Sequence, residues 1–451
     1  MFTLMITRPL FLLISLLSLL AAGCGSAARN ASSLAPEGAD QGVRVEATAD
    51  GDRLLVRGKP FYVRGACILS ASTLPAFAAA GGNTVRTYPG IDLDSVFHLA
   101  DSLGLMVIPG LDVTPRRHGL DYRDTAQVSA MKRRVKAQVL RYRDHPSLLM
   151  WGLGNEVHLL ASNQEDDIFG VINDLSRMVH RLDSRHPTTT MTNGPTGAWK
   201  VWQACDDLDV ISVNVFQGID ELKSLLKWGG GAIDQPILIS EWAPSGYWNA
   251  STTTWGAPIE MNAEEKAFSY TRHYQQYLSE ESGNLLGSCL FLWGQKQEHT
   301  HTWFSVFTEQ GEATVLTDEI ARLWTGQYPA NRAPLAQAIQ VGSYEIKEEV
   351  YLHPGQEYIA TGYALDADGD SLTYHWEITR EFERGFITGG DVEQRPAPMT
   401  ALCLEKAGDR FTFRAPDEIG AYRIYFYARD PHGKAGVMNL PFFVLKKPGL
   451  E

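Results

Sequence analysis

The sequence predicts an α/β fold, a (β/α)8 TIM barrel followed by a C-terminal Ig-like β-sandwich. From about residue 59 to 327, apolar strand-like runs alternate with helix-like runs. Eight such units in about 270 residues match the size of a (β/α)8 barrel. Beyond "NRAPL" at 331–335, short alternating strands are separated by turn signals, which is typical of a β-sandwich of about 100 residues. We therefore place the barrel, with a hairpin at its start, at 43–330 and the sandwich at 331–451.

Each strand expected in the barrel is a short run rich in apolar residues. The eight runs are 61–68, 83–88, 105–113, 147–156, 188–193, 208–216, 236–242 and 286–294, with helix-like runs between most of them, such as 94–103, 128–143, 166–182 and 263–279. An open doubly wound sheet is the alternative, but it would require a Gly-rich phosphate turn after an early strand. The segment "GGGA" at 229–232 precedes a strand instead of following one.

The first 23 residues have the pattern of a signal for export. Arg8 supplies one positive charge, and the apolar run 10–22 after it is too short to span a bilayer. Small residues then lead into Cys24, which resembles a bacterial lipobox and implies a lipid on that sulfur. Residues 24–42 are small and polar, as expected of a flexible tether. We expect a cell-envelope lipoprotein of the outer membrane or periplasm, held to the membrane by this anchor; a plain signal peptide with an incidental cysteine is the alternative.

The composition excludes some classes of partner. The 451 residues carry a formal net charge of −13, which argues against a nucleic-acid surface, since that would require a basic stripe. Four further cysteines are scattered without a C-x-x-C spacing, so neither a zinc site nor a dense disulfide framework is indicated. They are Cys67, Cys205, Cys289 and Cys403, and whether any two of them pair is left open.

We predict no metal and no cofactor. His299, His301 and Glu298 lie close together in the sequence, but no third histidine has a supporting spacing. The run Asp366-Ala-Asp-Gly-Asp370 fits a calcium loop only superficially, because its glycine stands at position four instead of six. A β-turn of the sandwich is the better interpretation.

Two of the expected strands end in a carboxylate. The fourth, "SLLMWGLGNE", ends in Asn155 and Glu156, and the seventh, "PILISEW", contains Glu241. A charge at the end of a buried strand costs desolvation energy. Active sites of (β/α)8 barrels lie at the C-terminal ends of the strands. One such carboxylate is more often a structural ion-pair partner, but two of them in one barrel indicate an active site.

The segments "GNTVRTY", "HPSLLMWGLGNE", "DVISVNVF" and "ILISEW", in this order, resemble clan A glycoside hydrolases, most closely the barrel of family 2. The resemblance covers roughly residues 55–327. It implies a retaining glycosidase with Glu156 as the acid/base and Glu241 as the nucleophile. Such a mechanism requires two carboxyl groups about 5–5.5 Å apart, one to attack the anomeric carbon and one to protonate the leaving oxygen.

The same resemblance implies roles for neighbouring residues. Asn155 would bond the sugar 2-hydroxyl, Arg86 would keep Glu241 ionised and oriented, and Trp293 would form the floor under the sugar ring. A structural ion pair for Arg86 and core packing for Trp293 are the alternatives. Clan relatives usually place a tyrosine near the end of strand six, in contact with the nucleophile. Here Phe216 stands there, with Asn214 nearby as an expected substrate-binding residue; Tyr247 or another tyrosine could substitute, or the contact could be missing.

The tryptophans bear on the substrate. Eight of the 11 fall between 199 and 303, namely Trp199, Trp202, Trp228, Trp242, Trp248, Trp255, Trp293 and Trp303. Several follow strands five, seven and eight, where rings could stack on sugars, although about half are expected in the core. We predict that Trp242, Trp303 and Gln295 join Trp293 in binding substrate. Such a set favours an oligosaccharide or polysaccharide over a disaccharide.

The sequence therefore predicts a retaining β-glycoside hydrolase that acts on a β-linked glycan. A barrel with a C-terminal Ig-like domain on an envelope lipoprotein resembles some endo-acting β-1,3-glucanases of this clan, so a β-glucan is the first candidate. Residues 340–447 look like a PKD or cadherin-like module. A transglycosylase on the same scaffold and a non-catalytic, glycan-binding surface lipoprotein are the alternatives. The oligomeric state is left open.

Overall fold

The computed structural model describes residues 42–49, 51–161, 164–216, 218–219, 233–279, 284–346, 348–383 and 391–445. The expected signal peptide, Cys24 and the tether up to residue 41 lie outside these residues, as does Trp228. In the part of the chain described, we find no helix with the length and apolar character that crossing a membrane requires.

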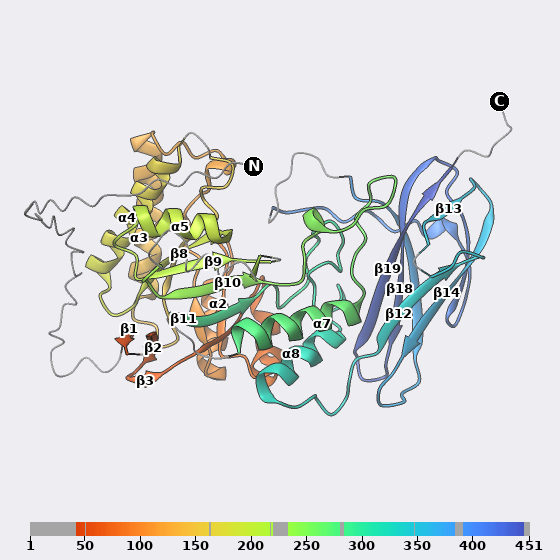
Figure 1. The fold of residues 1–451 in the computed structure, drawn as a ribbon, viewed down its shortest axis with the longest axis horizontal. Helices are drawn as coiled ribbons and strands as arrows, with labels where there is room; N and C mark the ends of the chain where they lie inside the picture. Colours follow the sequence, from red (N-terminus) through yellow and green to blue (C-terminus); the bar gives the residue numbers. More distant parts are fainter. Residues whose placement is uncertain are drawn as a thin grey trace, which may run out of the picture. The chain divides into compact units, whose positions relative to one another are not determined.

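Eight parallel strands form the barrel (Figure 1). They are β4 (Val63–Cys67), β5 (Thr84–Arg86), β6 (Met106–Ile108), β7 (Trp151–Asn155), β8 (Thr188–Asn193), β9 (Val210–Asn214), β10 (Ile237–Trp242) and β11 (Leu285–Leu290), in the order β6-β5-β4-β11-β10-β9-β8-β7. Parallel bridges from Val107 to Leu148 and from Gly110 to Gly152 join β6 to the β7 side, so the sheet is nearly closed. The prediction of a TIM barrel is confirmed, and each of the eight expected runs contains or overlaps one of these strands.

Helices surround the strands. They are α1 (Leu74–Ala79), α2 (Leu93–Leu103), α3 (Thr125–Tyr142), α4 (Glu165–Leu182), α5 (Gly194–Ala204), α7 (Ala263–His273) and α8 (Val315–Thr325), with a π-helical turn at Tyr274–Leu278 and short 3-10 turns at Ala71–Thr73, Arg116–His118 and Tyr247–Asn249. Helix α4 buries Ile168, Ile172, Leu175 and Val179, which share one face at helical spacing. Helices α7 and α8 pack against each other (Figure 1).

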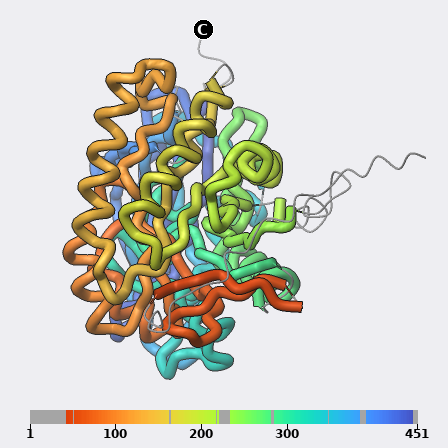
Figure 2. Tube along the Cα trace, turned by 90° about the vertical axis from the view of Figure 1, so that its left-hand side faces the viewer, coloured from red at the N-terminus to blue at the C-terminus, as the bar shows by residue number. Residues whose placement is uncertain are grey.

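A hairpin precedes the barrel, as expected. Strands β1 (Val43–Thr48) and β2 (Gly51–Val56) pair antiparallel, and the short β3 (Lys59–Pro60) adds to β2; they are red in Figure 2. The Val43 amide donates to the Arg185 carbonyl at 2.9 Å, and Arg57 donates to the Pro146 carbonyl at 3.0 Å. Both acceptors lie in segments that lead into barrel strands, so the hairpin lies at the N-terminal ends of the strands.

The C-terminal part is a β-sandwich of two four-stranded sheets. One sheet has the order β12-β14-β17-β16 and the other β13-β19-β18-β15, where the strands are β12 (Leu335–Val341), β13 (Val350–Leu352), β14 (Glu357–Leu365), β15 (Thr373–Arg380), β16 (Cys403–Ala407), β17 (Arg410–Arg414), β18 (Gly420–Arg429) and β19 (Ala435–Val444). A 3-10 turn at Thr400–Leu402 precedes β16. Between the sheets, Trp376 packs on Phe411 and Phe426. The predicted β-sandwich is present; its Ig-like classification stays a prediction.

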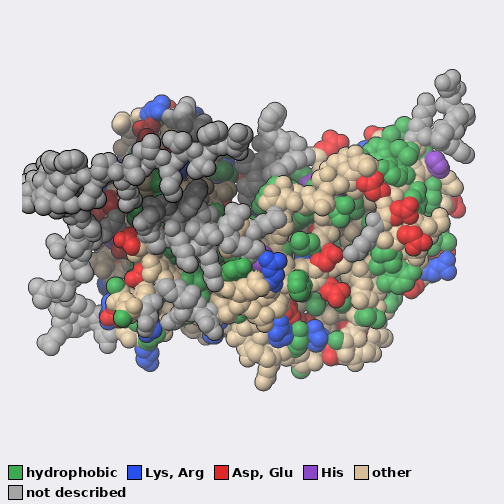
Figure 3. All heavy atoms as spheres, viewed as in Figure 1, with side chains coloured by type: hydrophobic (Ala, Val, Ile, Leu, Met, Phe, Trp, Pro, Cys, Tyr) green, Lys and Arg blue, Asp and Glu red, His purple; other side chains and the backbone are tan. Residues whose placement is uncertain are grey.

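Charged side chains are interspersed on the face of the molecule that Figure 3 shows. Acidic groups are spread over the sandwich, and lysine and arginine side chains stand among hydrophobic and neutral ones instead of forming a continuous stripe on that face. This distribution agrees with the acidic net charge of the sequence.

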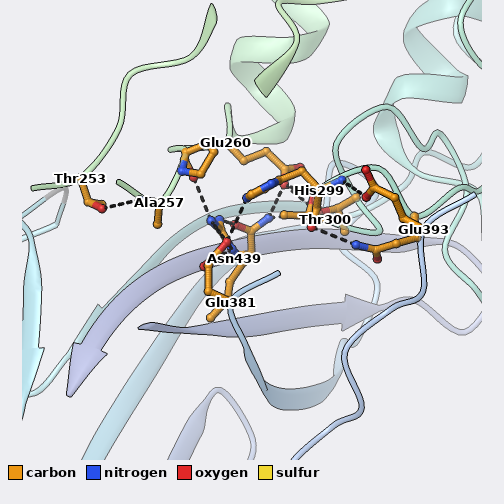
Figure 4. Close-up of polar contacts among 12 residues, drawn as sticks. Thr253, Ala257, Glu260, His299, Thr300, Glu381, Glu393 and Asn439 are labelled. Carbon is orange, nitrogen blue, oxygen red and sulfur yellow. Dashed lines mark hydrogen bonds and ion pairs between the residues drawn. The ribbon is translucent and has the colours of Figure 1, made fainter. Parts of the chain in front are cut away.

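Buried polar contacts join the sandwich to the barrel loops that follow β10 and β11. The Asn439 amide donates to Glu260 Oε2 at 2.7 Å, Arg423 donates to the Pro258 carbonyl at 2.8 Å, and His301 Nε2 lies 2.7 Å from the Tyr427 hydroxyl (Figure 4 shows part of this network). These loops lie at the C-terminal ends of the strands, so the sandwich contacts the barrel at the end where active sites form.

Burial and, after it, the positive charge of Arg395 lower the pKa of His301 to about 3. Glu260, Glu377 and Arg423 also act on this ring. An unfolded histidine takes up a proton near pH 6.5. Below that pH the unfolded chain binds more protons than the folded one, so the free energy of unfolding falls as the pH falls.

We expect His301→Gln to weaken this acid sensitivity. The loss of unfolding free energy between pH 7 and pH 4 should be smaller in the variant by roughly 1–3 kcal/mol, because glutamine does not titrate. Urea denaturation at both pH values measures it. His432→Gln changes an exposed sandwich histidine and serves as the control. If His301→Gln loses as much unfolding free energy between pH 7 and pH 4 as the unsubstituted protein, the low pKa of His301 does not cause the acid sensitivity.

Candidate active site

The predicted catalytic residues meet at the mouth of the barrel. Arg86 ends β5, Asn155 ends β7, Asn214 ends β9 and Glu241 is the residue before the last in β10, with Glu156 directly after β7. Parallel strands of a barrel present their C-terminal ends on one side. Hydrogen bonds connect all five side chains, so the structure brings together residues spread over more than 150 positions of the sequence.

Glu241 is held by a buried cation and a phenol. Its Oε1 accepts from Arg86 Nη1 at 2.7 Å and from the Tyr88 hydroxyl at 2.8 Å. Arg86 is only 1% exposed, and its Nη1 also donates to the Ser240 carbonyl at 2.9 Å. Charge-assisted bonds of this kind are short and directional, so they fix the orientation of the carboxylate. This environment suits a nucleophile.

Glu156 has a different environment. It is 9% exposed, and its Oε1 accepts one hydrogen bond, from Asn214 Nδ2 at 2.9 Å. Burial and, after it, the negative charge of Glu241 raise the pKa of Glu156 to about 7. A carboxyl group with such a pKa is protonated in a large fraction of molecules at neutral pH and can donate a proton.

The backbone at the end of β7 aims the Glu156 side chain. Gly154 has a φ of 85° and Glu156 itself a φ of 46°, a left-handed conformation that non-glycine residues rarely adopt. The turned Glu156 amide still donates to the Met191 carbonyl at 2.9 Å. Non-glycine residues with a strained backbone conformation of this kind are more frequent at functional sites. It also ends β7 one residue earlier than the expected run 147–156.

Asn155 connects the two carboxylates. Its Oδ1 accepts from Arg86 Nη2 at 2.6 Å and from Asn214 Nδ2 at 3.1 Å. Because the Oδ1 accepts from these donors and Asn155 lines the cavity, its side-chain Nδ2 is the group left to donate to a ligand. This N–H donor lies next to Glu156 and could donate to a sugar 2-hydroxyl oxygen, which is the role that the sequence resemblance implies for Asn155.

A cavity of about 1110 Å3 opens over these residues. This is above the usual 300–1,000 Å3 of small-molecule sites, so it has room for more than one sugar ring. Asn155, Glu156, Asn214 and Glu241 line it, together with the aromatic residues Tyr88, Phe216, Trp248 and Phe291 and the charged residues Asp112, Arg117, Lys296, Glu298, Asp391 and Glu393.

The structure does not place the predicted sugar-binding tryptophans in this cavity. Trp242 packs on Tyr270 and Tyr274, and the Trp303 indole donates to the Ser245 carbonyl at 3.0 Å; both side chains are buried. Trp293 is buried too, and its indole donates to the Thr73 carbonyl at 3.2 Å. These rings belong to the core: Trp242 packs on α7 and the π-helical turn after it, and Trp293 packs on Phe77 of α1 and Trp324 of α8.

Gln295 does not line the cavity either, whereas its neighbours Lys296, Gln297 and Glu298 do. Lys296 Nζ lies 2.5 Å from Glu298 Oε2, so the two side chains form an ion pair. Among the described tryptophans of the group between 199 and 303, Trp248 is the one that lines the cavity; it is 45% exposed and stands edge-on to Phe216. Trp248 is therefore the better candidate for stacking on a sugar ring.

Tyr88 is the functional residue that the sequence reasoning missed. It belongs to the quoted segment "GNTVRTY", two positions after Arg86, so the same strand end supplies the cation and the phenol. The tyrosine contact expected from strand six thus comes from the end of β5. Tyr247 does not supply it, because this buried ring packs against Trp248, His299 and Trp303.

His299 and His301 contact residues of the sandwich. His299 Nε2 lies 3.0 Å from Glu381 Oε1, and His301 Nε2 contacts Tyr427. In the turn before β15, Asp366 Oδ1 accepts from the amides of Asp368 and Asp370, both at 3.0 Å. Such bonds are typical of an Asx turn and agree with the turn interpretation of that acidic run.

Residues 74–276 match the family described as "Glycosyl hydrolases family 2, TIM barrel domain". The barrel is family 2-like. A β-glucuronidase of Streptococcus agalactiae is 24% identical in an alignment of 187 residues that covers 36% of this chain and 30% of that protein. These comparisons support a glycosidase.

Two solved structures share the fold. A calcium-binding mutant of β-glucuronidase 2 from Bacteroides uniformis has a TM-score of 0.50 at 13% identity, over 90% of this chain and 48% of that chain. A β-galacturonidase from Eisenbergiella tayi bound to galacturonate has a TM-score of 0.50 at 14% identity, over 64% and 55%. This chain therefore spans about half the length of these solved chains and under a third of the curated relative.

Tyr88→Phe should lower kcat/KM roughly 10-fold to 100-fold, because it removes one hydrogen bond of about 1.5–3 kcal/mol to a charged group. Steady-state kinetics on an aryl β-glycoside measures the change, and the melting temperature shows whether the fold is retained. Tyr363→Phe removes a hydroxyl that bonds Gln340 on the exposed sandwich surface and is the matched control. Equal kinetics in the two variants would refute a role for Tyr88.

Proposed function

We propose that this protein is a retaining β-glycoside hydrolase that acts on a neutral β-linked oligosaccharide or polysaccharide. The observation that carries the proposal is the pair of unlike carboxyl groups in one cavity. Glu241 is bonded by Arg86 and Tyr88, whereas Glu156 is buried with a pKa of about 7. Double displacement requires one carboxylate positioned to attack and one carboxyl group that can hold and donate a proton.

In the first step, Glu241 attacks the anomeric carbon and the bond to the leaving oxygen breaks. Glu156 gives its proton to that oxygen, so the leaving sugar departs neutral and a covalent glycosyl-enzyme remains. In the second step, the ionised Glu156 takes a proton from water, which attacks the same carbon and releases Glu241. Burial and, after it, the charge of Glu241 raise the pKa of Glu156, as expected of two carboxyl groups that share one buried site.

The charges of the cavity favour a neutral sugar. A sugar carboxylate would require a cation that no protein group already neutralises. Of the described residues that line the cavity, Lys296 is paired with Glu298, and Arg117 donates to the Glu156 carbonyl at 2.9 Å and lies 3.8 Å from Asp391. Among the same described residues, six acidic side chains line the cavity. A β-glucan is therefore the first candidate substrate, even though the relatives carry names of uronide hydrolases.

Two other functions use the same site. A sugar that replaces water in the second step would make the protein a transglycosylase, and Trp248 offers a surface on which such an acceptor could stack. A non-catalytic glycan binder would not need Arg86 and Tyr88 on one carboxylate. We also propose that a lipid on Cys24 holds the enzyme at the cell envelope, where it would meet polymeric substrate.

The proposed hydrolysis is tested by reducing-sugar release from β-glucans, xylan, mannan and galactan, with an aryl β-glucuronide for the acidic alternative. We expect cleavage of one neutral polymer and a loss on the order of 10^3-fold or more in Glu241→Gln. Glu357→Gln, an exposed sandwich substitution, is the matched control. Longer products instead of shorter ones would identify the transglycosylase, and binding without cleavage would refute the enzyme.

The pH profile should report Glu156. Its proton is needed for a poor leaving group, so kcat/KM on the oligosaccharide should fall about tenfold per pH unit above pH 7 as that group ionises. A 2,4-dinitrophenyl β-glycoside leaves without a proton, and its kcat/KM should not show this decline. The same alkaline decline with both substrates would contradict the assignment of Glu156 as the acid.

A further inference from the structure

A segment of the C-terminal sandwich lines the same cavity as the catalytic carboxylates. Asp391, Val392 and Glu393 lie between β15 and the 3-10 turn at Thr400–Leu402, yet they share this space with Glu156 and Glu241. The sandwich therefore supplies part of the wall of a site whose chemistry belongs to the barrel.

Buried contacts hold this segment in place. Glu393 is buried, and its Oε2 accepts from the His299 amide at 2.6 Å. The same His299 contacts Glu381 through Nε2 (Figure 4). Arg423 donates to Glu381 Oε1 at 2.8 Å. His299 has a φ of 59°, so its backbone adopts a left-handed conformation where these bonds form. The segment Asp391–Glu393 is thus hydrogen-bonded to the barrel loop after β11, and that loop is in turn bonded, through Glu381, to Arg423 of β18.

The position of Asp391 identifies which part of a substrate this wall would meet. Asp391 Oδ1 lies 2.8 Å from His118 Nε2 and 3.8 Å from Arg117 Nε. Arg117 in turn donates to the backbone carbonyl of Glu156. Since the acid/base protonates the leaving oxygen, groups beside Glu156 lie on the side of the leaving group.

The chemistry of the segment suits a sugar. Val392 is 90% exposed and offers an apolar surface to the cavity, while the Asp391 carboxylate, partly exposed, can accept from hydroxyl groups. Sugar sites combine apolar surface for the ring face with a few polar groups for hydroxyls. A small aryl or alkyl leaving group would leave both features unused.

We propose that Asp391 and Val392 bind the leaving-group sugar, so that the sandwich determines specificity for an oligosaccharide with a sugar on both sides of the cleaved bond. This proposal rests on the proposed hydrolase function. It makes the sandwich a constituent of the substrate site instead of a separate glycan-binding module.

The test compares two substrates in the full chain. One is a β-1,3-gluco-oligosaccharide, or the oligosaccharide of whichever polymer the protein cleaves; the other is the 4-nitrophenyl β-glycoside of the same sugar. For Val392→Ser and Asp391→Asn, the ratio of kcat/KM for the oligosaccharide to kcat/KM for the aryl glycoside should fall at least fivefold, mainly through KM. Leu365→Ser, an exposed apolar position on β14, should leave the ratio unchanged.

Each outcome is decisive. An unchanged ratio in both variants would overturn the proposal, as would an equal loss on both substrates together with a lowered melting temperature, which indicates a structural role. A fall in the ratio with an unchanged melting temperature would support it. If the unsubstituted protein cleaves neither substrate, the hydrolase function itself is overturned. This result is seen before any variant is measured, so it is distinct from the outcomes above.

Discussion

The buried guanidinium of Arg86 is the interaction on which the site depends. It donates to Glu241 and the Ser240 carbonyl of β10 and to Asn155 of β7, and so fixes groups from two other strands around one charge. A charge this deeply buried is tolerated only with partners, and removal of one partner of such a pair costs about 3–5 kcal/mol. Arg86 and Glu241 therefore act as one ion-paired unit, because the loss of either would leave the charge of the other buried without its partner.

This unit also determines the behaviour of the second carboxyl group. Burial and, after it, the negative charge of Glu241 raise the pKa of Glu156, and Asn214 provides one compensating hydrogen bond. The difference between the two glutamates is thus a property of their surroundings. Ser240, whose hydroxyl donates to Asn214 Oδ1 at 2.8 Å, connects the nucleophile strand to the residue that contacts the acid.

Much of this arrangement could be predicted from the sequence, because strands of a barrel are short apolar runs and their ends converge. Glu156 and Glu241 stand at such ends, as do Arg86 and Asn155. The aromatic residues could not be assigned in this way: Trp242 ends β10 and Trp293 follows β11 by three residues, yet both rings are buried against helices. Tyr88 could not be assigned because no feature of the sequence around it shows that its hydroxyl reaches Glu241, which lies 153 positions further along the chain. The contribution of Asp391 was beyond prediction because it comes from another domain.

The shared loop after β11 has a consequence for how this architecture can change in evolution. Glu298 lines the cavity, while His299 and His301, the next residues along, are bound to the sandwich. A substitution that alters the fit between the two domains therefore also moves the catalytic pocket. Exchange of the sandwich for an unrelated module would disturb this loop, so the two domains are expected to diverge together as one inherited unit.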